Sequence, residues 1–298
     1  MAIYSETLDA LVESTCRQVN DWVSGTATSG SSSTLADTSL ACYGNDYFND
    51  QDAWIYVRSG DAAGNYRKIS DFASTGGVIT VTPDFSAAIV AGVTYSIHHT
   101  RSEDSWHRPD VVAKINLAIQ RVAEKAHVWH VDTTSVTLAA STYEYALPLT
   151  FMGIYRVTMA DADGAFHTQP EIPPSEYWII PEATPKIHFR RTHADHLFSG
   201  HYLGNSWAET DFTATRKLRI EGLGSPATLT TDASVCPISP TYITFQAAAW
   251  LHAMKIRSAE NDPDEHRTQF QVCQAIAEAE KAEVVGAQLP INYRRCRE

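Results

Sequence analysis

The sequence has no apolar run that approaches the roughly 18 to 20 residues needed to span a bilayer, which argues against a membrane-spanning helix. It also lacks the basic start of a secretory signal peptide, because the opening segment MAIYSETLDALVE carries acidic residues instead. We therefore expect the protein to be made and to remain on the cytosolic side, with no membrane partner.

Cysteine is scarce and is not spaced for metal binding or redox chemistry. The five cysteines are an odd number, are widely scattered and include no C-x-x-C pair of the kind found in zinc sites and redox dithiols. They are Cys16, Cys42, Cys236, Cys273 and Cys296. We expect free thiols, most of them buried.

Positive charge is also in short supply. The formal net charge is −12, and a surface that clamps nucleic acid needs clustered Lys and Arg, so that class of protein is disfavoured. The exception is the C-terminal stretch NYRRCRE, which contains Arg294, Arg295 and Arg297. This basic tail either reaches an acidic partner or DNA, or is a solvated chain end.

Motifs of nucleotide chemistry are missing too, although GDAAGNYRKISDF resembles a phosphate-binding loop at first sight. A P-loop needs G-x-x-x-x-G-K-[ST] between a strand and a helix. Here Gly60 and Gly64 are one residue too close, Asn65 follows where a lysine is needed, and the next residues alternate like a strand. We therefore predict a β-hairpin whose glycines supply backbone angles that other residues resist.

No catalytic constellation emerges. The best metal candidates are His193 and His196 in HFRRTHADHLFSGH, but their flanks are loop-like and twelve histidines make chance clustering easy. The DADG stretch at 161–164 has no closing Glu for a calcium loop, and there is no G-x-S-x-G elbow. We predict no catalytic residue, no metal, no cofactor and no enzyme activity.

The pattern along the chain predicts alternating helical and β segments. Apolar residues recur at helical spacing from Leu8 to about Ser24-Gly25, and the polar stretch TATSGSSS that follows has the composition of a flexible linker. Four short runs at roughly ten-residue spacing then alternate like strands. These runs are AWIYVRS, NYRKISDF, GVITVTPDF and VTYSIHH.

Helical spacing returns at Pro109 and continues through Val122 and Ala126 to Trp129, which we expect in a helix core. Ser239-Pro240 and Asp262-Pro263 are typical starts of two further helices. The predicted class is α+β, a helical bundle with two antiparallel β insertions. Its segments are a bundle helix at 1–25, a small antiparallel β domain at 34–100, a central bundle helix at 105–130, a second β-rich unit at 131–230, a helical hairpin at 239–286 and a basic tail at 287–298.

Two segments carry longer patterns. GLGSPATLTTDASVCPISPTYITFQAAAWLHAM, from Gly222 to Met254, has a turn after a strand, a Leu-Thr-x-Asp run, an Ile-x-Pro entry and an Ala-rich helix. This pattern resembles one that is common in tailed-phage neck and tail-completion proteins, and the strand runs of residues 53–99 are similar to a β module that recurs in phage virion proteins. Together the two segments resemble tailed-bacteriophage head-to-tail adaptor, or connector, proteins of the neck.

The resemblance implies a structural virion protein assembled in the host cytoplasm. It would form a ring, usually a dodecamer, below the portal and around the DNA channel, with partners among the portal, tail and neck proteins. DNA would pass without sequence-specific binding, which an acidic body suits because like charges repel. The resemblance also implies that the C-terminal segment reaches the portal. The portal-contact candidates are Tyr293, Arg294, Arg295 and Arg297.

Other functions remain open at this point. A tail-tube, tail-terminator or fibre-attachment protein would share most of these features. A carbohydrate-binding module is a further alternative, because Trp54, Tyr56 and Tyr66 lie near predicted strand surfaces. An enzyme that uses His193 and His196, or the glycine loop, is the least favoured class.

Overall fold

The chain divides into two units in a computed structural model. The helix–sheet unit comprises Ala2–Ile119 and Thr228–Ala282, and the β unit comprises Gln120–Ala227 and Glu283–Glu298. The structure describes residues 4–101, 105–139, 142–160, 165–166, 171–172, 174, 177–189, 216–256, 263–285 and 294–295.

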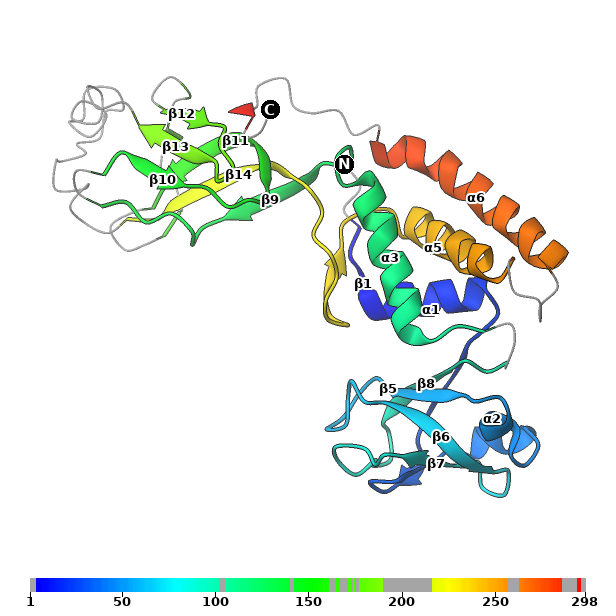
Figure 1. The fold of residues 1–298 in the computed structure, drawn as a ribbon. Helices are drawn as coiled ribbons and strands as arrows, with labels where there is room; N and C mark the ends of the chain where they lie inside the picture. The colour runs from blue at the N-terminus through cyan, green and yellow to red at the C-terminus, as the bar shows by residue number, and fades with distance from the viewer. Residues whose placement is uncertain are drawn as a thin grey trace. The chain divides into compact units, whose positions relative to one another are not determined.

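The helix–sheet unit contains a seven-stranded sheet in which all neighbouring strands are antiparallel, in the order β2-β8-β5-β6-β7-β4-β3 (Figure 1). The strands are β2 (Val23–Thr26), β3 (Ser29–Gly30), β4 (Thr34–Ala36), β5 (Trp54–Val57), β6 (Tyr66–Ala73), β7 (Val78–Thr82) and β8 (Thr94–His98). The 3-10 helix η1 (Thr38–Cys42) and helix α2 (Tyr47–Asp50) lie between β4 and β5. Alternation along the strands sends aliphatic and aromatic side chains into one core. Its largest members include Leu35, Phe48, Ile55, Phe72, Ile79 and Tyr95.

The predicted hairpin at GDAAGN is confirmed. Strands β5 and β6 pair with Tyr56 opposite Tyr66, so the loop between them is a tight connection within one sheet. Gly60 and Gly64 have φ angles of 79° and 85°, in the left-handed region that favours glycine. No atom lies within 4 Å of a Cβ built on Gly64, so backbone conformation rather than space requires glycine there.

Four longer helices are described in this unit. They are α1 (Leu8–Gln18), α3 (Arg108–Val122), α5 (Pro240–Lys255) and α6 (Pro263–Val285). Helices α3 and α6 each continue a few residues past the limits of the unit in the sequence. Capping explains two of the starts: the Thr7 side chain accepts from the Ala10 N–H, and Ser239 caps α5 with Pro240 in the first turn. Helix α1 packs against α5. The short strand β1 (Glu6–Thr7) pairs with β15 (Val235–Cys236).

Helices α5 and α6 run side by side and antiparallel, as the short connection between them predicted (Figure 1). Gln246 in the middle of α5 donates to Gln274 in the middle of α6 at 3.1 Å. Toward the end of α5 and the start of α6, the Nδ1 atoms of His252 and His266 are 3.0 Å apart in a buried hydrogen bond. These two polar contacts therefore help to fix the register of the pair.

The described residues of the β unit form two antiparallel sheets. The four-stranded sheet has the order β16-β11-β14-β9, and the three-stranded sheet has the order β10-β13-β12. The strands are β9 (Val128–Asp132), β10 (Glu144–Ala146), β11 (Phe151–Met159), β12 (Tyr177–Ile180), β13 (Lys186–Phe189), β14 (Leu218–Gly224) and β16 (Arg294–Arg295). Side chains from both sheets form one hydrophobic core, which includes Phe151, Ile154, Tyr177, Ile187 and Ile220.

The predicted architecture, a helical bundle with two antiparallel β insertions, is wrong. The fold is mixed and strand-rich, with a seven-stranded antiparallel sheet that belongs to the same unit as the helices. Three strands join the four that alternation predicted: β2 and β3 form from segments expected to be a helix end and a linker, and β4 follows directly after that linker. The predicted domain limits stay a prediction.

Three local expectations are corrected in the same way. The first helix ends at Gln18 rather than near Ser24-Gly25, and Val23–Thr26 pairs with β8. Within the stretch expected to be a flexible linker, Ser29 and Gly30 form β3, which pairs with β4 through main-chain hydrogen bonds that any side chain permits. Trp129 lies in β9, not in a helix, and its side chain is 38% exposed rather than part of a core.

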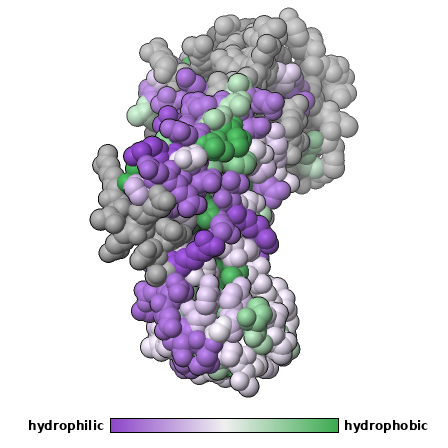
Figure 2. Space-filling model, turned by 90° about the vertical axis from the view of Figure 1, so that its right-hand side faces the viewer, coloured by the Kyte–Doolittle hydropathy of each residue, from purple (hydrophilic) through white to green (hydrophobic). Residues whose placement is uncertain are grey.

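The four described cysteines are free thiols, and all but Cys42 are buried, as predicted. Among the helices that the structure describes, none combines the length and the apolar character required to cross a membrane. On the face shown in Figure 2, hydrophilic residues predominate and hydrophobic ones form small separate patches. A surface of this kind suits contacts that combine polar groups with local apolar anchors.

Candidate functional site

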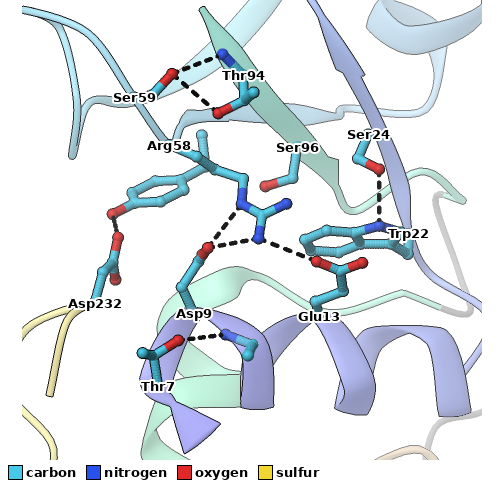
Figure 3. A network of polar contacts seen from close by, with 12 residues as sticks. Thr7, Asp9, Glu13, Trp22, Ser24, Arg58, Ser59, Thr94, Ser96 and Asp232 are labelled. Atoms are coloured by element: carbon cyan, nitrogen blue, oxygen red, sulfur yellow. Dashed lines mark hydrogen bonds and ion pairs between the residues drawn. The ribbon is translucent and has the colours of Figure 1, made fainter. Parts of the chain in front are cut away.

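A cluster of arginines and carboxylates joins the seven-stranded sheet to the helices of its unit. Arg58, directly after β5, binds two carboxylates of α1: its Nη2 lies 2.6 Å from Asp9 Oδ2 and 3.0 Å from Glu13 Oε2 (Figure 3). Asp9 and Glu13 are four residues apart, so both point from one face of the helix. The Thr7 cap places Asp9 in the first turn of α1, where a negative charge is also favoured by the helix dipole.

Arg108, the first residue of α3, forms the second half of the cluster. Its Nη2 lies 2.6 Å from Asp232 Oδ1 and 3.5 Å from Asp9 Oδ1, and its guanidinium lies 3.8 Å from the centre of the Tyr56 ring. The Tyr56 hydroxyl donates to the other oxygen of Asp232. Arg108 is only 9% exposed, whereas the side chains of Asp9 and Asp232 are 20% and 34% exposed, so these ion pairs are partly shielded from water. Asp9 therefore links the two arginines.

The protonation states of the cluster follow from this geometry. Burial acts to raise the pKa of Glu13, but the hydrogen bond from Arg17 and the charge of Arg58 outweigh it, so the pKa is lowered. Burial, and then the hydrogen bond to Asp232, raise the pKa of Tyr56, which stays a neutral donor. Glu13 is thus ionised and Tyr56 protonated at neutral pH. Neither Glu13 nor Tyr56 is therefore poised for proton transfer near pH 7.

A pocket of about 630 Å³ opens beside the cluster. Four segments contribute to its lining. They are the end of β5 with Tyr56 and Arg58, the hairpin residues between Ala63 and Tyr66, the start of α3 between Arg108 and Val112, and the turn at Thr230 to Ala233. The Tyr66 hydroxyl accepts from the Arg108 backbone N–H at 3.3 Å and thereby holds the hairpin against the helix start. The hairpin that resembled a phosphate loop is therefore one wall of a pocket whose charges are already paired.

A buried histidine, His98, feels the charges of Arg58 and Arg108 and makes the free energy of unfolding of this unit depend on pH. His98 of β8 contacts Cys16 Sγ through Nδ1 at 3.7 Å and Ser96 Oγ through Nε2 at 3.0 Å. Burial, with the charges of Arg108 and Arg58, lowers the pKa of His98 to about 3. Because the ordinary value is about 6.5, the unfolded chain binds more protons below that pH, and stability is lost as the pH falls from 6.5 toward 3.

We expect this group to cost about 2 kcal/mol of the free energy of unfolding between pH 7 and pH 5. Urea unfolding at the two pH values measures it, with His98→Gln as the variant that cannot take up a proton. The wild-type protein should lose about 2 kcal/mol more than the variant. Equal losses in the two proteins would rule out His98 as the source.

The structure places the other predicted site residues as follows. Trp54 stacks on Tyr66 with ring centres 4.9 Å apart, and Tyr56, which is 7% exposed, lines the pocket together with Tyr66. A carbohydrate-binding role for these three aromatic residues stays a prediction. His193, His196, Tyr293 and Arg297 lie outside the described residues. In the part of the chain that is described, no three His, Cys, Asp or Glu residues come together in a way that could hold a metal ion.

Arg294 and Arg295 form the short strand β16, which pairs with β11 at Ile154 and Gly153. Their role as portal contacts stays a prediction. Sequence reasoning missed Asp9, Arg58 and Arg108, for which no motif exists. One signal was available for Asp232, which ends the Leu-Thr-x-Asp run quoted above.

Comparison with known proteins identifies the family. A family model described as SU10 adaptor protein matches residues 94–292, which is 199 of the 298 residues. The matched part includes Arg108 and Asp232 of the cluster, α5, α6 and most of the β unit. No curated protein matches the chain. The match covers two thirds of the sequence, and the chain therefore belongs to the SU10 adaptor protein family, whose members are structural proteins of bacteriophage virions.

Proposed function

We propose that this protein is a head-to-tail adaptor that forms a ring below the portal and joins the capsid to the tail around the DNA channel. The family match over residues 94–292 is the observation that carries the proposal. The net charge of −12 supports a channel through which DNA slides without sequence-specific binding. We also propose a structural rather than an enzymatic role.

The arginine–carboxylate cluster supports the proposed adaptor role because it holds the seven-stranded sheet firmly to the helices of its unit. An adaptor transmits force between neighbours, so its parts must not slide on one another. Arg58 and Arg108 tie the sheet, α1, α3 and the turn at Thr230 to Ala233 together through partly buried ion pairs. Such pairs fix a unique arrangement because each displaced arginine would leave a carboxylate without its partner.

We expect the purified chain to assemble into a ring when it meets its portal protein. Native mass spectrometry of the chain alone, of the portal alone and of the mixture measures this. The expected result is a complex that carries one adaptor chain for each portal subunit. A chain that ignores the portal but joins purified tail proteins would favour a tail-tube, tail-terminator or fibre-attachment role instead, and binding on a glycan array would favour a carbohydrate-binding module.

The same measurement tests the proposed portal contacts. The triple variant Arg294→Ser, Arg295→Ser and Arg297→Ser should weaken the complex with the portal, because these three arginines supply the positive charge of the tail. The matched control replaces Arg267, an exposed arginine paired with Asp264 on α6. If the triple variant binds the portal as the wild type does, the basic tail is not the contact.

A further inference from the structure

One face of the four-stranded sheet carries aromatic and apolar side chains in solvent. Trp129 and Val131 of β9 are 38% and 47% exposed, and Tyr155 of β11 is 41% exposed. The Trp129 and Tyr155 rings contact edge to face with centres 5.5 Å apart. The opposite face of the sheet, with Ile154 and Ile220, belongs to the hydrophobic core. Among the residues that the structure describes, one face of the sheet therefore packs into the core, and the other leaves aromatic and apolar side chains partly exposed.

Two arginines stand beside these rings and share one carboxylate. Val131 is opposite Glu221 in the sheet register, and Glu221 is opposite Arg156. The Glu221 side chain is 4% exposed and lies 2.6 Å from Arg156 Nη2 and 2.6 Å from Arg219 Nε. Both arginine side chains stay more than a third exposed. Two cations on one carboxylate leave an excess positive charge on this face.

We call this surface the open sheet face and define it by Trp129, Val131, Tyr155, Arg156, Arg219 and Glu221. Trp, Tyr and Arg are the residues most enriched at the centres of protein interfaces. Exposed aromatic groups beside cations fit a protein partner that offers apolar contact and negative charge.

The rest of the chain offers that charge. The helix–sheet unit contains 11 Lys and Arg against 21 Asp and Glu, a net charge of −10, whereas the β unit contains 12 against 14, a net charge of −2. Two open sheet faces in contact would bring four arginines together and repel each other. Contact with the helix–sheet unit of another copy is attractive instead. A heterologous contact of this kind, in which two different surfaces of neighbouring copies meet, generates a ring when the rotation between copies closes.

We propose that the open sheet face binds the helix–sheet unit of a second copy of this chain. This inference rests on the proposed ring and names the surface through which its neighbours meet. The rings of Trp129 and Tyr155 supply the apolar anchor, and the two arginines select the acidic unit over a second open sheet face.

A photo-cross-linking amino acid at position 155 tests the contact in the full chain assembled with its portal. The change Tyr155→p-benzoylphenylalanine keeps an exposed aromatic ring in place. The expected product joins position 155 to a residue of 2–119 or 228–282 in another copy, identified by mass spectrometry. The matched control is Trp178→p-benzoylphenylalanine, because Trp178 is 40% exposed in the same unit but lies on the three-stranded sheet. The control should give no such product.

A double variant supplies an independent readout. Trp129→Ser with Tyr155→Ser should weaken association of neighbouring copies at least tenfold in sedimentation, while Trp178→Ser leaves it unchanged. Raising the salt concentration should also weaken the association of wild-type copies, because part of the attraction is electrostatic. Circular dichroism confirms that the double variant is folded.

The outcomes separate this inference from the proposed function. A ring that forms on the portal but cross-links position 155 to the β unit of its neighbour, or to no neighbour, overturns the inference and leaves the adaptor role intact. A chain that forms no oligomer with the portal overturns both. Cross-links to the helix–sheet unit together with the tenfold loss support the inference.

Discussion

Replacing Asp21 with alanine is expected to lower the free energy of unfolding of the helix–sheet unit by about 4 kcal/mol. The Asp21 carboxylate has no exposed surface. It accepts from the Thr100 hydroxyl at 2.8 Å, from the backbone N–H groups of Thr100 and Trp106 at 2.9 Å each, and from that of His99 at 3.2 Å. One side chain thus ties the segment entering the sheet to the segment leaving it.

The expected loss is large because alanine leaves buried donors without acceptors. Each such N–H group costs about 1 to 3 kcal/mol when it is buried unpaired. Asp21→Asn is the matched control: it keeps the shape and one acceptor oxygen but turns the other acceptor into a donor, so we expect about half the loss. Urea unfolding gives the free energies, and hydrogen exchange at the amides of Thr100 and Trp106 shows whether the loss is local to these contacts. Alanine and asparagine variants within about 0.5 kcal/mol of the wild type would mean that water replaces the carboxylate.

The parts of the fold that sequence predicted well are those with a regular period or a local signal. Strands β5 to β8 are short runs rich in β-branched and aromatic residues, and the hairpin glycines Gly60 and Gly64 have positive φ angles. Helix α5 begins at Pro240, as the Ser239-Pro240 pair predicted. Each of these signals acts within a few residues, so a single sequence contains it.

The predictions that failed depend on partners distant in the chain. Thr26–Ser33 reads as a linker because its side chains are small and polar, yet β3 is held by main-chain groups of β4. Trp129 continues the helical spacing of Val122 and Ala126, but residues 128–132 also alternate, and pairing with β14 selects the strand. Strand pairing at β3 and at β9 adds strands to two different sheets, and the fold is strand-rich rather than the expected helical bundle.

The candidate site was invisible for the same reason. Asp9, Arg58, Arg108 and Asp232 are separated by at least 49 residues, and charged residues at such spacing carry no pattern. Their meeting follows from the register of β1 with β15 and from the position of α3 against the sheet. Family resemblance pointed to the right class of protein because it samples long segments rather than single contacts.

Replacing Arg108 with methionine is the second change with a large expected effect, a loss of about 3 kcal/mol in the free energy of unfolding. Methionine keeps most of the volume against the Tyr56 ring but removes the charge between Asp9 and Asp232. Breaking a buried ion pair from one side costs about 3 to 5 kcal/mol, and Asp232 is a third exposed, so the low end applies. Urea unfolding of the full chain measures the loss. The matched control is Arg267→Met, because the Arg267 side chain is 56% exposed beside Asp264 and such pairs contribute about 0 to 1 kcal/mol.

A double variant decides whether the loss at Arg108 arises from the ion pair with Asp232 or from the packing of the long side chain. If the pair is responsible, Arg108→Met combined with Asp232→Asn should cost less than the sum of the two single changes by more than about 1 kcal/mol, because the second substitution removes the carboxylate that the first one leaves without its partner. Additive losses would assign the effect to packing against Tyr56. A loss at Arg108 no larger than that at Arg267 would show that the cluster does not hold the sheet to the helices. The cluster would then give no support to the adaptor proposal.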